Sequence, residues 1–425
     1  MRHALTLLAL LSLASFANAA TRNNDDSCDI AVMPAATLLL PYFEVDLDSP
    51  NGATTLFTIT NATAQAQIAR VVLWTDYSYP VIDFYIYLTG YDVQSINLYD
   101  VLARGIIGTS RGTGPDVSHK GEFSEANARI DASQCDRLPG GPISNFYREM
   151  FRTAFTQGIV PPLASSGCTN IGGKHKNAVG YATIDVVRSC TFGSFAPRAF
   201  VEEMLWDNVL LGDTMQIDRN HNFAEGNPMV HIRAIPEGGT LEQRRSDPQY
   251  AVTFPRTFYD NLSSQMVKTL DGRQPLPSIF AAHYNTWDGE TSMKIWRQPT
   301  TSIGLRCAEY QYNDRDIYET VAFDEEENAT GRAPQYIVLP IAPDMPLPST
   351  SITSVRDPII FPSLFTSAGW MFIDLASQGW IVTSMRTEGR FSVDMDAIAM
   401  GNGCSTPPYG TEVNYYDGAP IGPLP

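Results

Sequence analysis

TTLFTITNATAQAQIARVVLWTDYSYPVIDFYIYLTGYDVQSINLYDVL, residues Thr54–Leu102, is the stretch that decides the fold class. Between Val81 and Leu88 the side chains alternate in character with the two-residue period of a pleated strand. Turn-forming residues interrupt the stretch at intervals typical of sandwiches and barrels. We therefore expect four consecutive antiparallel strands that fold back on one another. The predicted class is mainly β, an antiparallel β-sandwich of the Ig-like or jelly-roll-like kind.

The first 19 residues have the three parts of a secretory signal peptide. Arg2 is basic, Ala4–Phe16 is apolar, and Ala17-Asn18-Ala19 forms a small-x-small cleavage site. We expect a secreted protein, extracellular or periplasmic, with no membrane span, because no later apolar run is long enough. The formal net charge of −17 disfavours nucleic acid and anionic membrane surfaces as partners.

The remaining chain divides into two β-rich regions. Residues 20–240 are expected to form the N-terminal sandwich, with an insertion at about 104–177 that contains a helix over Ile143–Gln157. The polar segment Pro236–Gln249 is the predicted boundary, because it has neither strand nor helix period. Residues 250–405 are expected to form a second β-rich domain, and the proline-rich tail 406–425 has no periodicity.

The entry strand of the first sandwich is expected over Ala36–Leu47. It contains Pro41, which has no N–H for a ladder hydrogen bond. The proline predicts that this strand lies at the edge of its sheet.

An even number of cysteines in an exported chain predicts three disulfides. The sequence leaves the pairing open, and the pairing we expect is Cys307–Cys404, Cys135–Cys168 and Cys28–Cys190. Zinc is the disfavoured alternative, because no two of the cysteines have the close spacing of zinc ligands. The six residues are Cys28, Cys135, Cys168, Cys190, Cys307 and Cys404.

Four tyrosines of the deciding stretch are the candidate ligand-binding residues. If they are exposed, their rings could stack on a sugar or form a protein-binding patch. If the insertion covers them, they belong to the core, and this alternative is favoured. The residues are Tyr77, Tyr79, Tyr85 and Tyr87.

Asp218, Asn220 and Asn222 have the alternate spacing of the first three ligands of a calcium loop. The rest of that loop is missing, since Phe223 stands where glycine is needed and Met229 where a bidentate glutamate belongs. A polar turn between strands is the favoured alternative. Apart from calcium, the sequence indicates no cofactor.

Two further patterns are typical of enzymes but lack the required context. Gly108–Gly112 matches the G-x-S-x-G pattern around Ser110, yet Gly112-Thr113-Gly114-Pro115 cannot continue as the necessary helix. The histidines include no HExxH motif. We interpret the first pattern as a glycine-rich loop and expect His231, in an apolar run, to be a core or edge residue.

Four short phrases resemble those of a group of uncharacterised secreted bacterial proteins. The resemblance covers most of the mature chain, and it implies export but no activity, ligand or functional residue. The phrases are Trp74-Thr75-Asp76, Asn208-Val209-Leu210 with Gly212-Asp213, Val230-His231-Ile232-Arg233-Ala234 and Gly401-Asn402-Gly403-Cys404.

The leading functional hypothesis is a non-enzymatic binding or structural protein, with a glycan or a cell-surface protein as partner. It follows from the disulfide-bearing β composition and from motifs that do not complete any catalytic arrangement. The alternatives are a secreted glycoside hydrolase that uses paired carboxylates and a subunit of a surface assembly. The hydrolase would bring two acids together in a cleft, one with a raised pKa.

Overall fold

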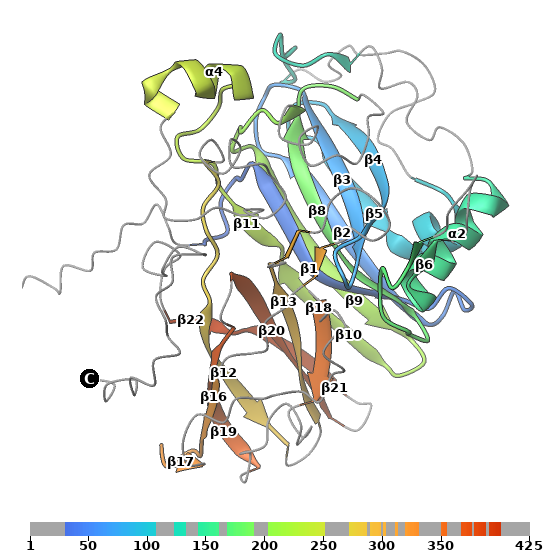
Figure 1. Cartoon of the computed structure of the whole chain (residues 1–425), viewed down its shortest axis with the longest axis vertical. Helices are drawn as coiled ribbons and strands as arrows, with labels where there is room; N and C mark the ends of the chain where they lie inside the picture. Colours follow the sequence, from blue (N-terminus) through green and yellow to red (C-terminus); the bar gives the residue numbers. More distant parts are fainter. Residues whose placement is uncertain are drawn as a thin grey trace, which may run out of the picture.

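The computed structural model describes fourteen separate stretches of the chain. They are residues 30–107, 123–132, 143–160, 168–190, 203–250, 272–286, 290–298, 301–302, 311–312, 319–330, 350–354, 367–375, 378–387 and 391–400. Within them the protein is mainly β, with antiparallel sheets in a β-sandwich-like arrangement (Figure 1). None of the helices in these stretches is both long enough and apolar enough to cross a membrane.

The first pair of sheets packs face to face around the largest hydrophobic core. One sheet has the order β11-β1-β8-β3-β4 and the other β10-β9-β2-β5. The strands are β1 (Thr37–Val45), β2 (Ala53–Asn61), β3 (Gln67–Thr75), β4 (Pro80–Leu88), β5 (Val93–Asn97), β8 (Ala178–Val187), β9 (Leu210–Asp218), β10 (Phe223–Pro228) and β11 (Val230–Ile232).

The pattern of buried residues along each strand depends on whether one or both of its faces are covered by other parts of the protein. Along β2, buried and half-buried residues alternate strictly, because one face meets the core and the other faces outward. In β3 and β8 every residue is buried, since these strands are covered on both faces. The four strands expected within Thr54–Leu102 are confirmed as β2, β3, β4 and β5.

The predicted pairing of sequence neighbours in the deciding stretch is correct only for β3 and β4. β2 pairs with β5 in the opposite sheet, so the chain crosses between sheets before β3 and again after β4. Side-chain alternation shows that a segment is a strand but does not show which sheet it joins. The stretch ends in a short π-helix, Asp100–Arg104.

The prediction that Pro41 marks an edge strand is wrong. β1 lies between β11 and β8, and its register with β8 shifts between Leu40 and Phe43, around the proline. A bulge removes the need for a ladder N–H at that position. The Pro41 carbonyl instead accepts a hydrogen bond of 2.6 Å from the Thr350 hydroxyl, in the second half of the chain.

The helix predicted in the insertion is confirmed as α2 (Asn145–Gln157). Its buried face carries Phe151, Ala154 and Phe155, which belong to the main core, and Phe155 meets Phe43 edge to face at 5.5 Å. Gly158 ends the helix in the left-handed conformation that favours glycine. A two-stranded ribbon, β6 (Ile159–Val160) with β7 (Cys168–Thr169), follows it.

The second pair of sheets packs around a separate core. The orders are β17-β16-β19-β12-β22 and β18-β13-β20-β21, and β14 (Thr301–Ser302) pairs with β15 (Gln311–Tyr312). The strands are β12 (Ile279–Asn285), β13 (Glu290–Arg297), β16 (Glu319–Phe323), β17 (Ala329–Thr330), β18 (Thr350–Ser354), β19 (Ala368–Asp374), β20 (Gly379–Thr387), β21 (Phe391–Asp396) and β22 (Ile398–Ala399). A single residue, Ala397, separates β21 from β22.

The two pairs of sheets meet at a buried surface that we call the junction. Trp74 of β3 stacks on Tyr181 of β8 at 5.8 Å, and Tyr181 meets Trp296 of β13 edge to face at 5.7 Å. β13 and β18 contact β1, and β21 contacts β10 (Figure 1). The hydrophobic cluster of the junction comprises Leu39, Val72, Trp74, Tyr181, Val230, Ile232, Leu276 and Trp296.

The predicted boundary segment Pro236–Gln249 contains a short helix, α4 (Leu241–Ser246), and the start of a 3-10 turn, Pro248–Tyr250. Thr240 and Gln243 form a capping box, in which each side chain accepts a hydrogen bond from the other residue's N–H. The T-x-x-Q pattern was visible in the sequence and could have predicted this helix.

Candidate functional site

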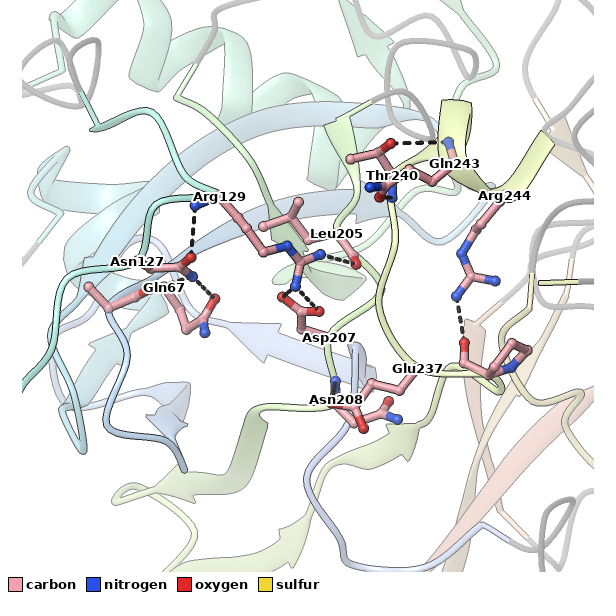
Figure 2. Close-up of polar contacts among 12 residues, drawn as sticks. Gln67, Asn127, Arg129, Leu205, Asp207, Asn208, Glu237, Thr240, Gln243 and Arg244 are labelled. Atoms are coloured by element: carbon pink, nitrogen blue, oxygen red, sulfur yellow. Dashed lines mark hydrogen bonds and ion pairs between the residues drawn. The ribbon is translucent and has the colours of Figure 1, made fainter. Parts of the chain in front are cut away.

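A polar cluster gathers where the loop before β9 meets the insertion and the loop after β11 (Figure 2). The Asp207 carboxylate receives Arg129 Nη1 on both oxygens, at 2.7 and 2.8 Å, and Arg129 Nη2 donates to the Leu205 carbonyl at 3.3 Å. Asp207 is buried, whereas the Arg129 side chain is 43% exposed. The insertion therefore supplies the counter-charge to a carboxylate of the sandwich.

Asn208 ties the same loop to the segment that follows β11. Its amide donates to the Ala234 carbonyl at 2.9 Å and accepts from the Ala234 N–H at 2.8 Å. The Asn208 N–H donates to Glu237 at 3.1 Å, and the Gly238 N–H donates to the Trp206 carbonyl at 2.8 Å. These bonds place the carboxyl groups of Asp207 and Glu237 in one neighbourhood.

Trp206 directly precedes Asp207 in the chain. It is fully buried and has a φ of 62°, in the left-handed region that bulky residues rarely adopt. The Arg244 guanidinium lies 4.5 Å from the centre of its ring, and that of Arg273 lies 5.5 Å away. The indole thus lies against two guanidinium groups, which come from α4 and from the approach to β12.

The environment of Asp207 disfavours its charged form. Burial raises the pKa of the Asp207 carboxyl above its ordinary value, the Arg129 hydrogen bond and charge oppose this, and the Glu237 charge adds to it. A carboxyl with a raised pKa beside a second carboxyl is an arrangement that acid catalysis can use. Here both oxygens of Asp207 are bound by Arg129, as in a structural ion pair.

The contribution of Asp207 to the free energy of unfolding should decrease as the pH rises. Because the folded state holds this proton more tightly than the unfolded chain, the contribution is present at acid pH and is lost as the pH rises through the raised pKa. The unfolding free energy of the wild type, relative to that of Asp207→Asn, should therefore fall as the pH rises from below 3.8 to neutral. Urea titrations at several pH values measure this difference.

The exposed pair Asp100–Arg104 offers the matched control for that experiment. Asp100→Asn removes one carboxylate from the same protein without touching the cluster. The raised pKa of Asp207 is contradicted if the difference in unfolding free energy between the wild type and Asp207→Asn stays constant with pH. It is also contradicted if that difference grows as the pH rises.

A second polar site lies at the junction. Glu225 of β10 forms an ion pair with Lys294 of β13 and accepts a hydrogen bond of 2.6 Å from the Ser384 hydroxyl of β20. The adjoining cavity, lined by Glu225, Lys294 and Tyr42 among others, measures about 30 Å³. That volume holds a water molecule or two and is far below the several hundred Å³ of a sugar-sized site.

The structure separates the four predicted tyrosines. Tyr85 and Tyr87 are buried in a small cluster with Ile130 and Ala132 of the insertion packed against it. Burial raises the pKa of Tyr85 to about 12. Tyr79 is half-buried and packs against the main core, and Tyr77 is half-buried. Tyr85 and Tyr87 thus occupy the core position that was weighed as the alternative to ligand binding.

Asp218 ends β9, and Asn220 and Asn222 lie in the turn between β9 and β10. Asp218 Oδ1 accepts the N–H groups of Asn220 and His221 at 3.0 and 3.3 Å, and Oδ2 lies 2.6 Å from His221 Nδ1. The turn itself therefore engages the carboxylate that would bind calcium. No group of three or more His, Cys, Asp or Glu side chains that could hold a metal occurs in the described stretches. The calcium site stays a prediction.

The disulfide pairing also stays a prediction. Cys28, Cys135, Cys307 and Cys404 lie outside the described residues, and Cys168 is described only as part of β7. Cys190 is fully buried, in the same cluster as Tyr85 and Tyr87. The predicted signal peptide and the Gly108–Gly112 motif lie outside the described residues as well.

The motifs that carry the resemblance coincide with buried polar contacts. Asp76 is buried, accepts the Gly173 N–H at 3.0 Å and lies 2.9 Å from His175 Nε2. His231 is buried and accepts the Gly212 N–H at 3.2 Å, as expected for a core residue. Asn208 belongs to the Asp207 cluster. Gly401–Cys404 lies outside the described residues.

Sequence reasoning missed both polar sites. Arg129 and Asp207 are 78 positions apart, and Glu225 and Ser384 are 159 apart, so neither pair forms a motif. The one available signal was a charged residue within an apolar run, as at Lys294 in β13.

Comparison with known proteins adds no relative: no family model, no curated protein and no solved structure matches this chain.

Proposed function

We propose that the protein is an exported, non-enzymatic binding or structural protein in which two β-sandwiches act as one rigid unit. The observation that supports it is the junction, where aromatic stacking, hydrogen bonds and buried ion pairs join the two pairs of sheets. Interfaces between domains that move are smaller and more polar. A rigid, extended unit is suited to presenting surfaces to a partner.

Polar contacts reinforce the apolar part of the junction. Thr350 of β18 bonds the Pro41 carbonyl through its hydroxyl and the Asp76 carbonyl through its N–H, at 2.6 and 3.2 Å. Arg273, which precedes β12, reaches Asp185 of β8 at 3.4 Å, and both side chains are buried. Each contact joins a group from the second half of the chain to a strand of the first half or to the turn that follows β3.

The experiment that tests this proposal is a binding screen run beside an activity screen. Purified mature protein is applied to immobilised glycans and cell-surface proteins, and separately to a panel of polysaccharide substrates. We expect saturable binding to one class of surface ligand and no turnover. Substitution of the half-buried Tyr77 and Tyr79 by alanine tests the ligand-binding prediction, with the exposed Tyr147→Ala as control. Turnover without binding would reverse the proposal.

The second candidate is a glycoside hydrolase, and the Asp207 cluster is the observation that favours it. Asp207 has a raised pKa and feels the Glu237 charge, as the acid of a carboxylate pair does. If turnover is found, Asp207→Asn should abolish it while the fold persists. Unchanged turnover in that variant would exclude this pair of carboxylates.

Export and three disulfides remain part of the proposal. We expect the denatured, unreduced protein from an oxidising compartment to react with no thiol reagent at its six cysteines.

A further inference from the structure

The ion pair between Glu225 and Lys294 joins a strand of the first sandwich to a strand of the second. Glu225 is on β10 of the first pair of sheets, and Lys294 is on β13 of the second pair. Lys294 Nζ is in direct contact with Glu225 Oε1, and the two side chains are only 8% and 4% exposed. An amine and a carboxylate are thus held together where water is scarce.

Two aromatic rings lie close to the amine of this contact. The rings of Tyr42 and Phe223 lie 5.7 and 5.9 Å from Lys294 Nζ. Burial, followed by the Glu44 charge and hydrogen bond, raises the pKa of the Tyr42 hydroxyl well above its usual range. A charged pair is expensive to keep in such a place, and conversion to a neutral group would relieve that cost.

Ser384 distinguishes the two oxygens of the glutamate. Its hydroxyl donates to Glu225 Oε2 at 2.6 Å, whereas Oε1 is the oxygen that contacts Lys294. Ser384 and Lys294 come from neighbouring strands of one sheet, so their relative position is fixed by the ladder between β13 and β20. One carboxylate oxygen is therefore held by a hydrogen bond, and the other faces the amine.

We propose that Lys294 and Glu225 condense to an amide that covalently joins the two sandwiches. A proton passes from the Lys294 ammonium to Oε1, and the amine lone pair then attacks the Glu225 side-chain carbonyl carbon, Cδ, forming the N–C bond. A second proton moves from nitrogen to Oε1, the Cδ–Oε1 bond breaks, and Oε1 leaves as water. One ammonium and one carboxylate become one neutral amide and one water, so atoms and charge balance without a further reactant.

Each neighbouring group has a definite part in this step. The Ser384 hydroxyl stabilises negative charge that develops on Oε2, which remains as the amide oxygen. The fixed contact of Nζ with the carboxylate replaces a bimolecular encounter by an intramolecular one, which favours reaction strongly. The adjoining cavity of about 30 Å³, lined by both residues, has room for the water that leaves.

Mass spectrometry of the fully reduced, denatured chain tests the proposal. The wild type should weigh one water less than its mature sequence, and trypsin should release a branched peptide that joins the Glu225 segment to an uncleaved Lys294. Lys294→Arg keeps the positive charge but lacks a reactive amine, so it should have the full mass. The exposed Lys174→Arg is the matched control and should retain the loss of water. Ser384→Ala should lower the fraction that has lost water.

The result that overturns the proposal is a wild type of full mass whose Lys294 is cleaved by trypsin, since the contact would then be an ion pair only. The wild-type measurement alone decides this, even if Lys294→Arg does not fold. The outcome is independent of the binding screen, because the amide requires no ligand.

Discussion

Replacing Trp296 with alanine is expected to lower the free energy of unfolding by about 3–5 kcal/mol. Trp296 is fully buried at the junction and meets Tyr181 edge to face at 5.7 Å. Its removal leaves a cavity between two rigid sheets, which have little freedom to close it because each is fixed by its own core. Denaturant titration followed by circular dichroism measures the change in midpoint.

Phe123→Ala is the matched control, because the Phe123 side chain is 73% exposed. Its effect should stay within about 0.5 kcal/mol. The Trp296 variant should also separate the unfolding of the two sandwiches into distinct transitions, since the junction couples them. If Trp296→Ala proves as stable as Phe123→Ala, the junction does not carry the stability assigned to it.

Replacing Asp185 with leucine is expected to cost about 3–5 kcal/mol, because the change leaves the Arg273 guanidinium buried without this carboxylate. Asp185 and Arg273 side chains are 3% and 0% exposed, and the ion-pair distance is 3.4 Å. Asp185 also accepts a hydrogen bond of 2.6 Å from Thr37, which the same substitution removes. Urea unfolding at neutral pH measures the loss.

The double variant Asp185→Leu with Arg273→Met distinguishes a buried charge from simple packing. Removal of both charges should restore much of the lost stability, since the single change removes only one of two buried opposite charges. In the exposed pair Asp100–Arg104, the corresponding single change Asp100→Ala should cost only about 0.3–0.5 kcal/mol. If the double variant is no more stable than Asp185→Leu alone, the loss of stability at this site comes from altered packing and not from the buried charge.

The class of fold was readable from the sequence because alternation is a local property. The strands around 54–60, 68–75 and 81–88 and the helix of the insertion have periods that one segment displays by itself. Sheet membership is a non-local property, and the pairing of β2 with β5 could not be read from either strand. The Pro41 prediction failed for the same reason, because a bulge depends on the partner strand.

The sites were harder to predict than the strands. Asp207 and Arg129 meet only after the insertion folds back on the sandwich, and Lys294 meets Glu225 only when the two halves dock. The sequence makes Tyr85 and Tyr87 candidates for either the surface or the core, and they lie in the core because Ile130 and Ala132 pack against their cluster. The sequence of a segment does not show that another segment, distant in the chain, covers it.

The order of strands in the first sandwich has a consequence for how the chain acquires its fold. β1 and β2 each take as neighbour a strand that follows the whole insertion, with Thr37 opposite Asp185 and Ala53 opposite Asp218. Closing such long loops slows folding and delays the formation of both sheets. At the rate of ribosomal synthesis, β8 would be completed on the order of ten seconds after β1. During that interval the backbone N–H and C=O groups of the apolar strand β1 lack their partner strand, so this segment is vulnerable to aggregation.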